Sequence, residues 1–170
     1  MIFRVPDTIP RTAAIHGDAQ PAGAIAALLT EYGFAIHGPD GPGPVGVLIN
    51  TVPANGIHQR IQAFADALPP PHQGVAINLL GQGVWSLTPH AIPDAMERAA
   101  LWRLTQTMAL ALAPRIRVCA IGSGPVLGGG PLPREPDPRQ IARAVLAILA
   151  FPSMTGQMIV PDGAPPDRHA

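Results

Sequence analysis

The chain has 170 residues, of which 47% are hydrophobic and 13% charged, and eleven basic residues balance eleven acidic ones. This composition predicts one folded domain over residues 1–170 and excludes a disordered chain. With a net charge of zero, nothing in the composition suggests nucleic acid or a membrane surface as a partner. No apolar run is long enough to span a bilayer, and the first residues do not begin a secretory signal. We therefore expect a soluble, cytoplasmic protein, with residues 1–11 as an N-terminal extension and residues 164–170 as a loose tail.

Apolar runs and helical patterns alternate in the first half of the chain. The patterns predict strands at 12–16, 34–37 and 45–50, and helices at 22–32 and 57–68. Only the segment GPDGPGP, residues 38–44, joins the second of these strands to the third. Its glycines and prolines fit neither a helix nor a central strand.

The second half continues the alternation around one long helix. Strands are predicted at 74–80, 115–121 and 156–160, and helices at 93–113 and 138–150. Strands that are apolar throughout, separated by helices, indicate an α/β fold with a parallel sheet. The long helix carries a broad apolar face, which predicts burial against the sheet on one side and against a partner on the other. That face consists of Met96, Ala100, Leu101, Leu104, Met108 and Leu112.

Several segments together resemble the short-chain dehydrogenase/reductase family, in its pteridine-reductase-like branch. They are HGDAQPAG at 16–23, LINTV at 48–52, the strand, helix and strand at 74–126, and TGQMIVPDG at 155–163. The resemblance implies a Rossmann-like, doubly wound parallel sheet of about six strands. The family's third strand and its helix would be missing, because only residues 38–44 stand in their place.

The family's reactive residues are replaced in this chain. The resemblance aligns its catalytic serine with Gly81, and its Tyr-x-x-x-Lys pair with Asp94 and Arg98. The chain contains no lysine, and Tyr32 is its single tyrosine. Arg98 and the helix N-terminus both favour the ionised form of Asp94, so this carboxylate cannot donate a proton at neutral pH. An i,i+4 ion pair is the simpler interpretation of Asp94 and Arg98.

The resemblance also implies a reduced cofactor site. Gly17 and Gly23 match glycines of the family's nucleotide loop, and Asn50 matches an asparagine after its fourth strand. Asp18, beside Gly17, is unfavourable next to a phosphate. Asp40 stands where a ribose contact would fall, but an acid in such a loop is usually solvated. We expect no bound cofactor, with weak NAD(P) binding as the open alternative.

The remaining reactive side chains have structural interpretations. His16 and His37 end two strands and could begin a metal site, but no third ligand is evident, so no metal is expected. A cysteine within a strand is expected to be an inert core thiol, and a serine between two glycines does not lie in a nucleophile elbow. Two tryptophans could line a core, a pocket or an interface. These residues are, in the same order, Cys119, Ser123, Trp85 and Trp102.

Three hypotheses for function follow from the resemblance. The first is a non-catalytic binding or partner subunit, a pseudoenzyme that forms a homo-oligomer, or a hetero-oligomer with a full-length homologue, through the helix at 93–113. The second is an NAD(P)-dependent oxidoreductase that acts on a pterin or small carbonyl substrate through substitute residues. The third is a drifting remnant with no selected role. The first is favoured because the reactive residues are replaced.

Overall fold

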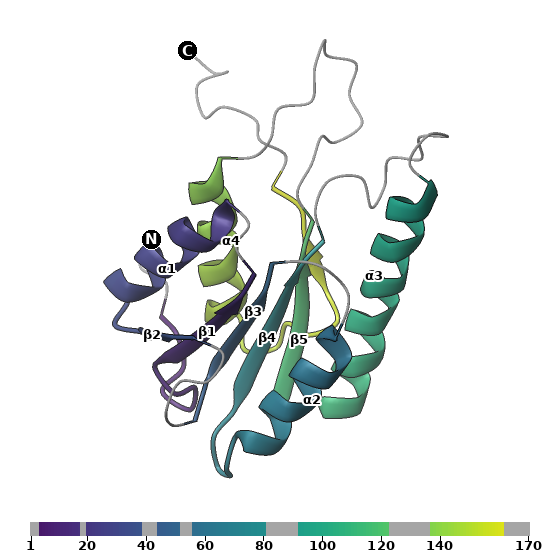
Figure 1. Cartoon of the computed structure of the whole chain (residues 1–170). Helices are drawn as coiled ribbons and strands as arrows, with labels where there is room; N and C mark the ends of the chain where they lie inside the picture. The colour runs from purple at the N-terminus through teal and green to yellow at the C-terminus, as the bar shows by residue number, and fades with distance from the viewer. Residues whose placement is uncertain are drawn as a thin grey trace.

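A computed structural model describes residues 4–17, 20–38, 44–51, 56–80, 92–122 and 137–161. Within these ranges the chain forms a six-stranded sheet and four helices (Figure 1). The strands are β1 (Thr12–His16), β2 (Ala35–His37), β3 (Val47–Asn50), β4 (Gly74–Leu79), β5 (Ile116–Ile121) and β6 (Met158–Ile159). The helices are α1 (Pro21–Glu31), α2 (Ile57–Ala67), α3 (Ile92–Leu112) and α4 (Pro138–Ala150).

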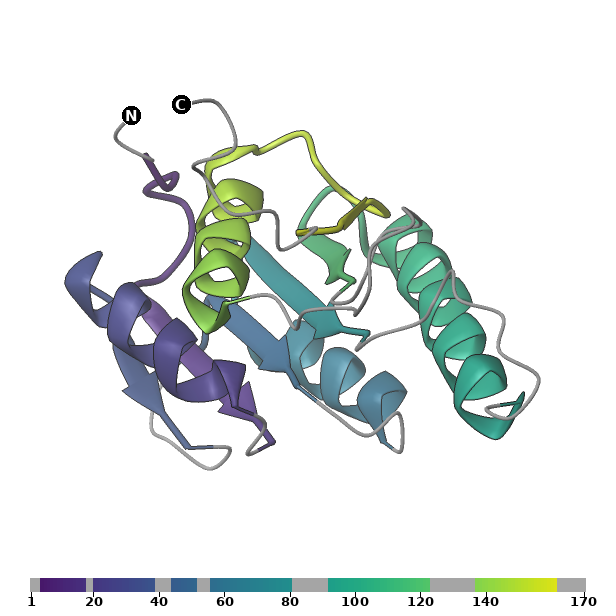
Figure 2. The ribbon, with the colours of Figure 1, turned by 90° about the horizontal axis from the view of Figure 1, so that it is seen from above.

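The sheet is parallel throughout, in the order β2-β1-β3-β4-β5-β6. The chain builds outward from β1 in both directions, first to β2 and then, through β3, toward β6. Helices α1 and α4 cover one face, and α2 and α3 cover the other (Figures 1 and 2). The predicted doubly wound, Rossmann-like fold of six strands is therefore confirmed. Between β2 and β3, the described residues contain no further strand.

Two apolar cores lie on opposite faces of the sheet. The core under α1 and α4 includes Ile25, Leu29 and Val145, all at most 1% exposed, packed on alternate residues of the strands. The core under α2 and α3 includes Ile61 and Leu101 with the other set of strand residues. Because β3, β4 and β5 contribute to both cores, they are buried along their whole length, which explains why their sequences are mostly apolar.

The observed strands are shorter than predicted at several ends. The strand expected from residue 45 begins at Val47, although the amide of Gly46 already donates to the Thr12 carbonyl oxygen at 2.9 Å. A Cβ at position 46 would collide with the carbonyl oxygen of Pro10. Glycine is thus required where the chain entering β1 passes the start of β3.

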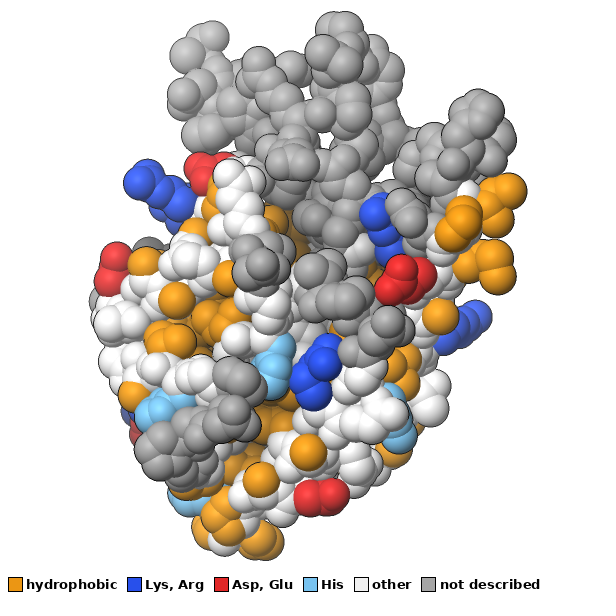
Figure 3. Space-filling model, in the orientation of Figure 1, with side chains coloured by type: hydrophobic (Ala, Val, Ile, Leu, Met, Phe, Trp, Pro, Cys, Tyr) orange, Lys and Arg blue, Asp and Glu red, His pale blue; other side chains and the backbone are white. Residues whose placement is uncertain are grey.

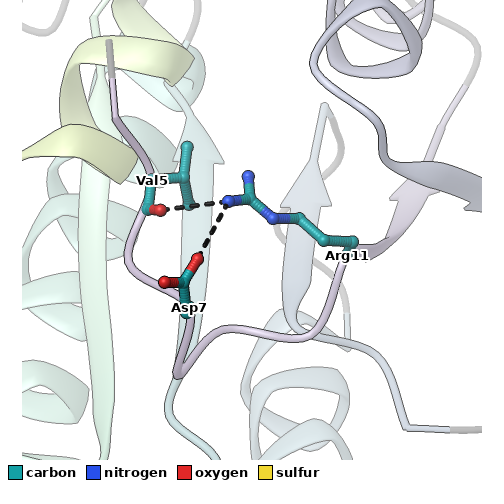
Figure 4. A network of polar contacts seen from close by, with 3 residues as sticks. All are labelled: Val5, Asp7 and Arg11. Carbon is teal, nitrogen blue, oxygen red and sulfur yellow. Dashed lines mark hydrogen bonds and ion pairs between the residues drawn. The ribbon is translucent and has the colours of Figure 1, made fainter.

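The N-terminal extension packs into the core under α1 and α4. Val5 and Ile9 are each 2% exposed and belong to that core. Arg11 fastens the segment, because its Nη2 donates to the Val5 carbonyl oxygen at 3.0 Å and lies 3.8 Å from Asp7 Oδ1 (Figure 4). The guanidinium also lies 5.1 Å from the centre of the Phe34 ring. The described part of the extension, residues 4–11, is therefore integral to the fold.

The long helix α3 divides its apolar residues between two sides. Leu101, Met108 and Ala109 are buried against the sheet. Met96 is 68% exposed and Leu110 is 85% exposed. Within the predicted broad apolar face, Leu101 and Met108 thus lie against the sheet, whereas Met96 and Ala100 are exposed, and their burial against a partner stays a prediction. Figure 3 shows apolar side chains gathered on the outer side of the helix, over the upper part of α3.

Candidate functional site

Polar residues end three neighbouring strands at the carboxyl edge of the sheet. In the strand register, His16 of β1 lies opposite Asn50 of β3, and Asn50 lies opposite Asn78 of β4. Thr51 follows directly, and its Oγ1 donates to the His16 carbonyl oxygen at 2.9 Å. Ligands of doubly wound sheets bind outside the carboxyl ends of the strands, near the point where the strand order reverses. This edge is therefore the candidate site.

A chain of side-chain hydrogen bonds runs from α2 to α3 through these strand ends. Arg60 Nε donates to Asn50 Oδ1 at 3.2 Å, and Asn50 Nδ2 donates to Asn78 Oδ1 at 2.9 Å. Asn78 Nδ2 donates to Thr105 Oγ1 at 2.9 Å, and that hydroxyl donates to the Leu101 carbonyl oxygen at 2.9 Å. We call the residues Arg60, Asn50, Asn78 and Thr105 the amide relay. It joins both helices of this face to the two strands between them.

The amide relay gives Asn50 a role inside the protein. Asn50 is 1% exposed and Asn78 is 0% exposed, and each uses both its amide nitrogen and its amide oxygen within the relay. The sequence reasoning named Asn50 as a cofactor contact and missed the other three members of the relay. A signal was available, since Asn78 and Thr105 interrupt apolar patterns, and a buried polar group needs a partner.

Of the two glycines assigned to a nucleotide loop, only Gly17 has a backbone conformation that requires glycine. Gly17 follows β1 with φ of 98°, a conformation that side chains rarely adopt. Gly23 lies inside α1, where a Cβ would meet nothing within 4 Å. At the start of that helix, Pro21 has no N–H to offer a phosphate, and Gln20 makes no side-chain cap. Asp18 and Asp40 lie outside the described residues.

The positions aligned with the reactive residues are only partly described. Gly81 and the side chain of Asp94 lie outside the described residues. Asp94 belongs to the first turn of α3, as predicted, and Arg98 follows one turn later, half-buried. The expected ion pair between them stays a prediction.

The single tyrosine lies on the opposite side of the molecule from this site. Tyr32 caps the C-terminus of α1, where its backbone N–H donates to the carbonyl oxygens of Leu28 and Leu29. Its side chain packs against the core under α1 and α4. Since α1 runs back from the carboxyl edge to the start of β2, its C-terminus stands at the amino edge of the sheet. The sheet therefore lies between Tyr32 and α3. The length of the strands separates Tyr32, at the amino edge, from the candidate site at the carboxyl edge.

Cys119 is a buried thiol within β5. Its Sγ donates to the Met154 carbonyl oxygen at 3.3 Å, and the residue is 0% exposed. Burial raises the pKa of this thiol, partly offset by the neighbouring Arg117 guanidinium. The core interpretation of Cys119 agrees with this environment. Trp102 is half-buried and packs against the core under α2 and α3, whereas Trp85 and Ser123 lie outside the described residues.

The two histidines stand on neighbouring strands at different heights. His37 lies opposite Ala14, two residues before His16, so the side chains end β1 and β2 at staggered levels. His16 makes a further contact within the chain. In the described ranges, no three His, Cys, Asp or Glu side chains converge as a metal site would require. Nor does any described helix combine the length and hydropathy of a membrane span.

Solved structures with the same fold are numerous. The alternative dihydrofolate reductase 1 FolM from Brucella suis, solved in complex with NADP, is 24% identical over 89% of this chain and 93% of its own, with a TM-score of 0.72. A short-chain dehydrogenase/reductase from Serratia marcescens is 20% identical over 89% of this chain and 95% of its own, with a TM-score of 0.70.

An aldohexose dehydrogenase from Thermoplasma acidophilum, in a C-terminal deletion form, is 16% identical over 92% of this chain and 97% of its own, with a TM-score of 0.65. No family model matches the sequence, and no curated protein matches it. At these identities the similarity establishes the short-chain dehydrogenase/reductase fold, and the site must be argued from its own residues.

Proposed function

We propose that this chain is a short-chain dehydrogenase/reductase-like protein without hydride-transfer chemistry, which acts as a binding or partner subunit. The observation that carries the proposal is the place of Tyr32, at the amino edge of the sheet and on the face opposite α3. The chain has no other tyrosine and no lysine. The reacting pair implied by the resemblance therefore has no equivalent at the carboxyl edge.

Asp94 is a poor substitute for a tyrosine acid. It stands in the first turn of α3, where the positive end of the helix favours a carboxylate over a neutral acid. A general acid needs a pKa near the working pH, whereas an unperturbed aspartate titrates near ~3.9. Arg98, one turn later, is permanently charged and adds to the same preference. The pair is suited to holding charge in place and not to delivering a proton.

A second function is favoured by the ligands of the structural neighbours. The Brucella suis protein was solved with NADP, and another neighbour with this fold is an NADPH-dependent reductase of bacilysin biosynthesis. Under this alternative, the chain binds NAD(P) at the carboxyl edge and reduces a pterin or small carbonyl compound through substitute residues. Gly17, with its positive φ after β1, is the described feature that supports nucleotide binding there.

Two measurements on the purified chain separate these functions. Calorimetry with NADPH and NADP⁺ reports binding, and absorbance at the nicotinamide band reports NADPH consumption with pterin and aldehyde substrates. We expect no consumption above the rate without protein. The oxidoreductase alternative instead requires a rate that Asp94→Asn or Arg98→Ala lowers by about tenfold or more, the scale of a lost general acid or charge contact. Glu97→Gln, between the two positions on α3, is the matched control.

We also propose that α3 forms the contact with a partner subunit. Ile92, Met96 and Leu110 are all more than half exposed, and they lie on the side of α3 that faces away from the sheet. The partner is a second copy or a longer homologue. Zero net charge favours a protein partner over nucleic acid or a membrane, and we place both partners in the cytoplasm.

A further inference from the structure

One arginine stands at the carboxyl edge without an acidic partner among the described residues. Arg60 lies near the start of α2, half-buried, and its Nε donates to Asn50 Oδ1 at 3.2 Å. Within the described ranges, its two terminal nitrogens, Nη1 and Nη2, have neither a hydrogen bond nor an ion pair. Among the described residues, the guanidinium is therefore held through Nε alone, with Nη1 and Nη2 left for a ligand.

The amide relay fixes where this guanidinium lies. The amide nitrogen of Asn50 donates to Asn78, which in turn donates to Thr105, and these bonds hold Asn50 with its oxygen toward Arg60. On the other side, a Cβ at Gly56 would lie 3.2 Å from Nη1. Gly56 has φ of 78° and is the N-cap of α2, so the missing side chain makes room for the guanidinium. A positioned cation loses less conformational entropy on binding than a free one.

The electrostatic surroundings of Arg60 also favour the binding of an anion. Helix α2 has no side-chain cap and no acidic residue in its first turn, so its positive end is unbalanced. A cation in this place is unfavourable unless an anion offsets it. The sequence contains no Asp or Glu between Asp40 and Asp66, and Asp66 lies at the far end of α2, where it accepts from Gln62 at 3.0 Å.

We propose that Arg60 binds an oxyanion, a phosphate or carboxylate group of a small-molecule ligand, at the carboxyl edge between β3 and α2. With Nε committed to Asn50, the edge formed by Nη1 and Nη2 is the remaining fork, and this geometry matches two oxygens of one oxyanion. The inference rests on the proposed function, since it names the chemistry that a binding subunit would recognise. It requires no hydride transfer and no tyrosine.

The test uses inorganic phosphate and acetate as probes of the whole chain at constant ionic strength. Calorimetry or amide chemical shifts should give saturable binding to the wild type, and the stronger probe identifies the phosphate or the carboxylate source. Arg60→Gln should weaken binding about tenfold or more, since the variant loses the charge-assisted contacts of the guanidinium. Arg60→Lys, which keeps the charge without the fork, should fall between the two. Arg143→Gln, on exposed α4 surface, is the matched control and should leave binding unchanged.

Two outcomes would overturn the proposal. One is a wild type that binds neither probe, and the other is equal binding by the wild type and Arg60→Gln. If Arg60→Gln does not fold, as judged by circular dichroism, Arg60→Lys becomes the deciding variant. Undiminished binding by Arg60→Lys would refute the two-point contact through Nη1 and Nη2. NADPH consumption is measured on the same samples. Consumption by the wild type would refute the proposed function whatever the anion result, and failed anion binding without consumption would refute the Arg60 site alone.

Discussion

Thr105 is the residue on which the amide relay ends. Its hydroxyl accepts from Asn78 and donates to the Leu101 carbonyl oxygen, and the residue is 0% exposed. Removing the hydroxyl leaves Asn78 Nδ2 buried without an acceptor. Such a loss costs more than the net contribution of a hydrogen bond, because the stranded donor keeps its full desolvation penalty.

Thr105→Val should therefore lower the free energy of unfolding by about 1–3 kcal/mol. Thr107→Val provides a matched control, since Thr107 makes the same hydroxyl bond to the carbonyl oxygen four residues earlier, Arg103 O at 2.9 Å, but is exposed. Its cost should stay within about 0.5 kcal/mol. Urea denaturation followed by circular dichroism gives both values. Equal losses in the two variants would mean that the relay contributes nothing specific.

Cys119 offers a second residue-scale test through its pKa. Burial raises the pKa of the folded thiol above its usual value, so the folded state holds its proton at a pH where the unfolded state has lost it. The stabilising contribution is complete below the unfolded pKa, near ~8.5, and is lost as pH rises through the raised pKa. Stability should therefore fall as pH rises above about 8.5, and this fall should be smaller in Cys119→Ala. A thiol reagent should modify the folded wild type about a thousandfold or more slower than the unfolded chain. Rapid modification of the folded chain would contradict the buried position.

At the scale of elements, β5 stabilises the C-terminus of α4 through one side chain. Arg117 is 7% exposed, and its Nη1 lies 2.8–3.0 Å from the carbonyl oxygens of Ile148, Phe151 and Met154. Its Nη2 lies 3.4 Å from the Leu149 carbonyl oxygen. A positive charge at this place also complements the negative end of the helix. Burial lowers the pKa of Arg117, so these hydrogen bonds must offset a desolvation cost.

Arg117→Met should cost about 2 kcal/mol or more, because several buried carbonyl oxygens lose their donor together. Arg117→Lys should recover only part of the loss, since one ammonium cannot reach acceptors spread around a planar guanidinium. Arg143→Met, on the exposed side of the same helix, should stay within about 0.5 kcal/mol. Thermal unfolding of the three variants checks these values. If Arg143→Met lost as much stability as Arg117→Met, the hydrogen bonds of Arg117 to the end of α4 would not be the cause.

The elements also show what could be predicted from sequence. Sequence patterns predicted each strand and helix of the described residues, because runs such as Val47–Asn50 and Gly74–Leu79 are mostly apolar on both faces, as expected for a covered parallel sheet. They assigned α4 from Pro138 to Ala150 to the residue, where Asp137 caps the first turn by accepting from Arg139 N at 2.9 Å. Element ends were less certain where strand pairing, and not composition, decides them.

Side-chain partners were harder to predict than elements. Asn50 was assigned to a ligand because it follows a strand, yet its partners come from α2 and from β4, 10 and 28 residues away. Val5 and Ile9 lie in a segment without periodicity, so only the packing reveals that they belong to the core. Which part of the broad apolar face of α3 lies against the sheet could not be predicted for a similar reason, since its apolar residues spread over more than one side of the helix.

At the scale of the whole molecule, the outer side of α3 is the most exposed apolar surface of the described chain. Ile92, Met96 and Leu110 are 59%, 68% and 85% exposed. The exposed residues Ala99, Arg103 and Thr107 lie between Met96 and Leu110 along the helix. Burying each large side chain would contribute about 1.5–3 kcal/mol. Association costs at least ~4 kcal/mol, so a stable contact needs most of this side of the helix and not one residue alone.

Light scattering should therefore report a mass of at least twice 17.7 kDa for the wild type at micromolar concentration. Met96→Glu combined with Leu110→Glu should shift the chain to a monomer, because two carboxylates from each subunit would be buried without partners. Ala27→Glu, on the exposed side of α1, controls for added charge and should leave the mass unchanged. Both variants should keep the unfolding midpoint of a well-folded monomer, since neither site contacts the core. A wild type that stays monomeric at all concentrations would leave only a longer homologue as the partner. That remaining case is tested by mixing the chain with such a homologue and asking whether Met96→Glu with Leu110→Glu abolishes the complex.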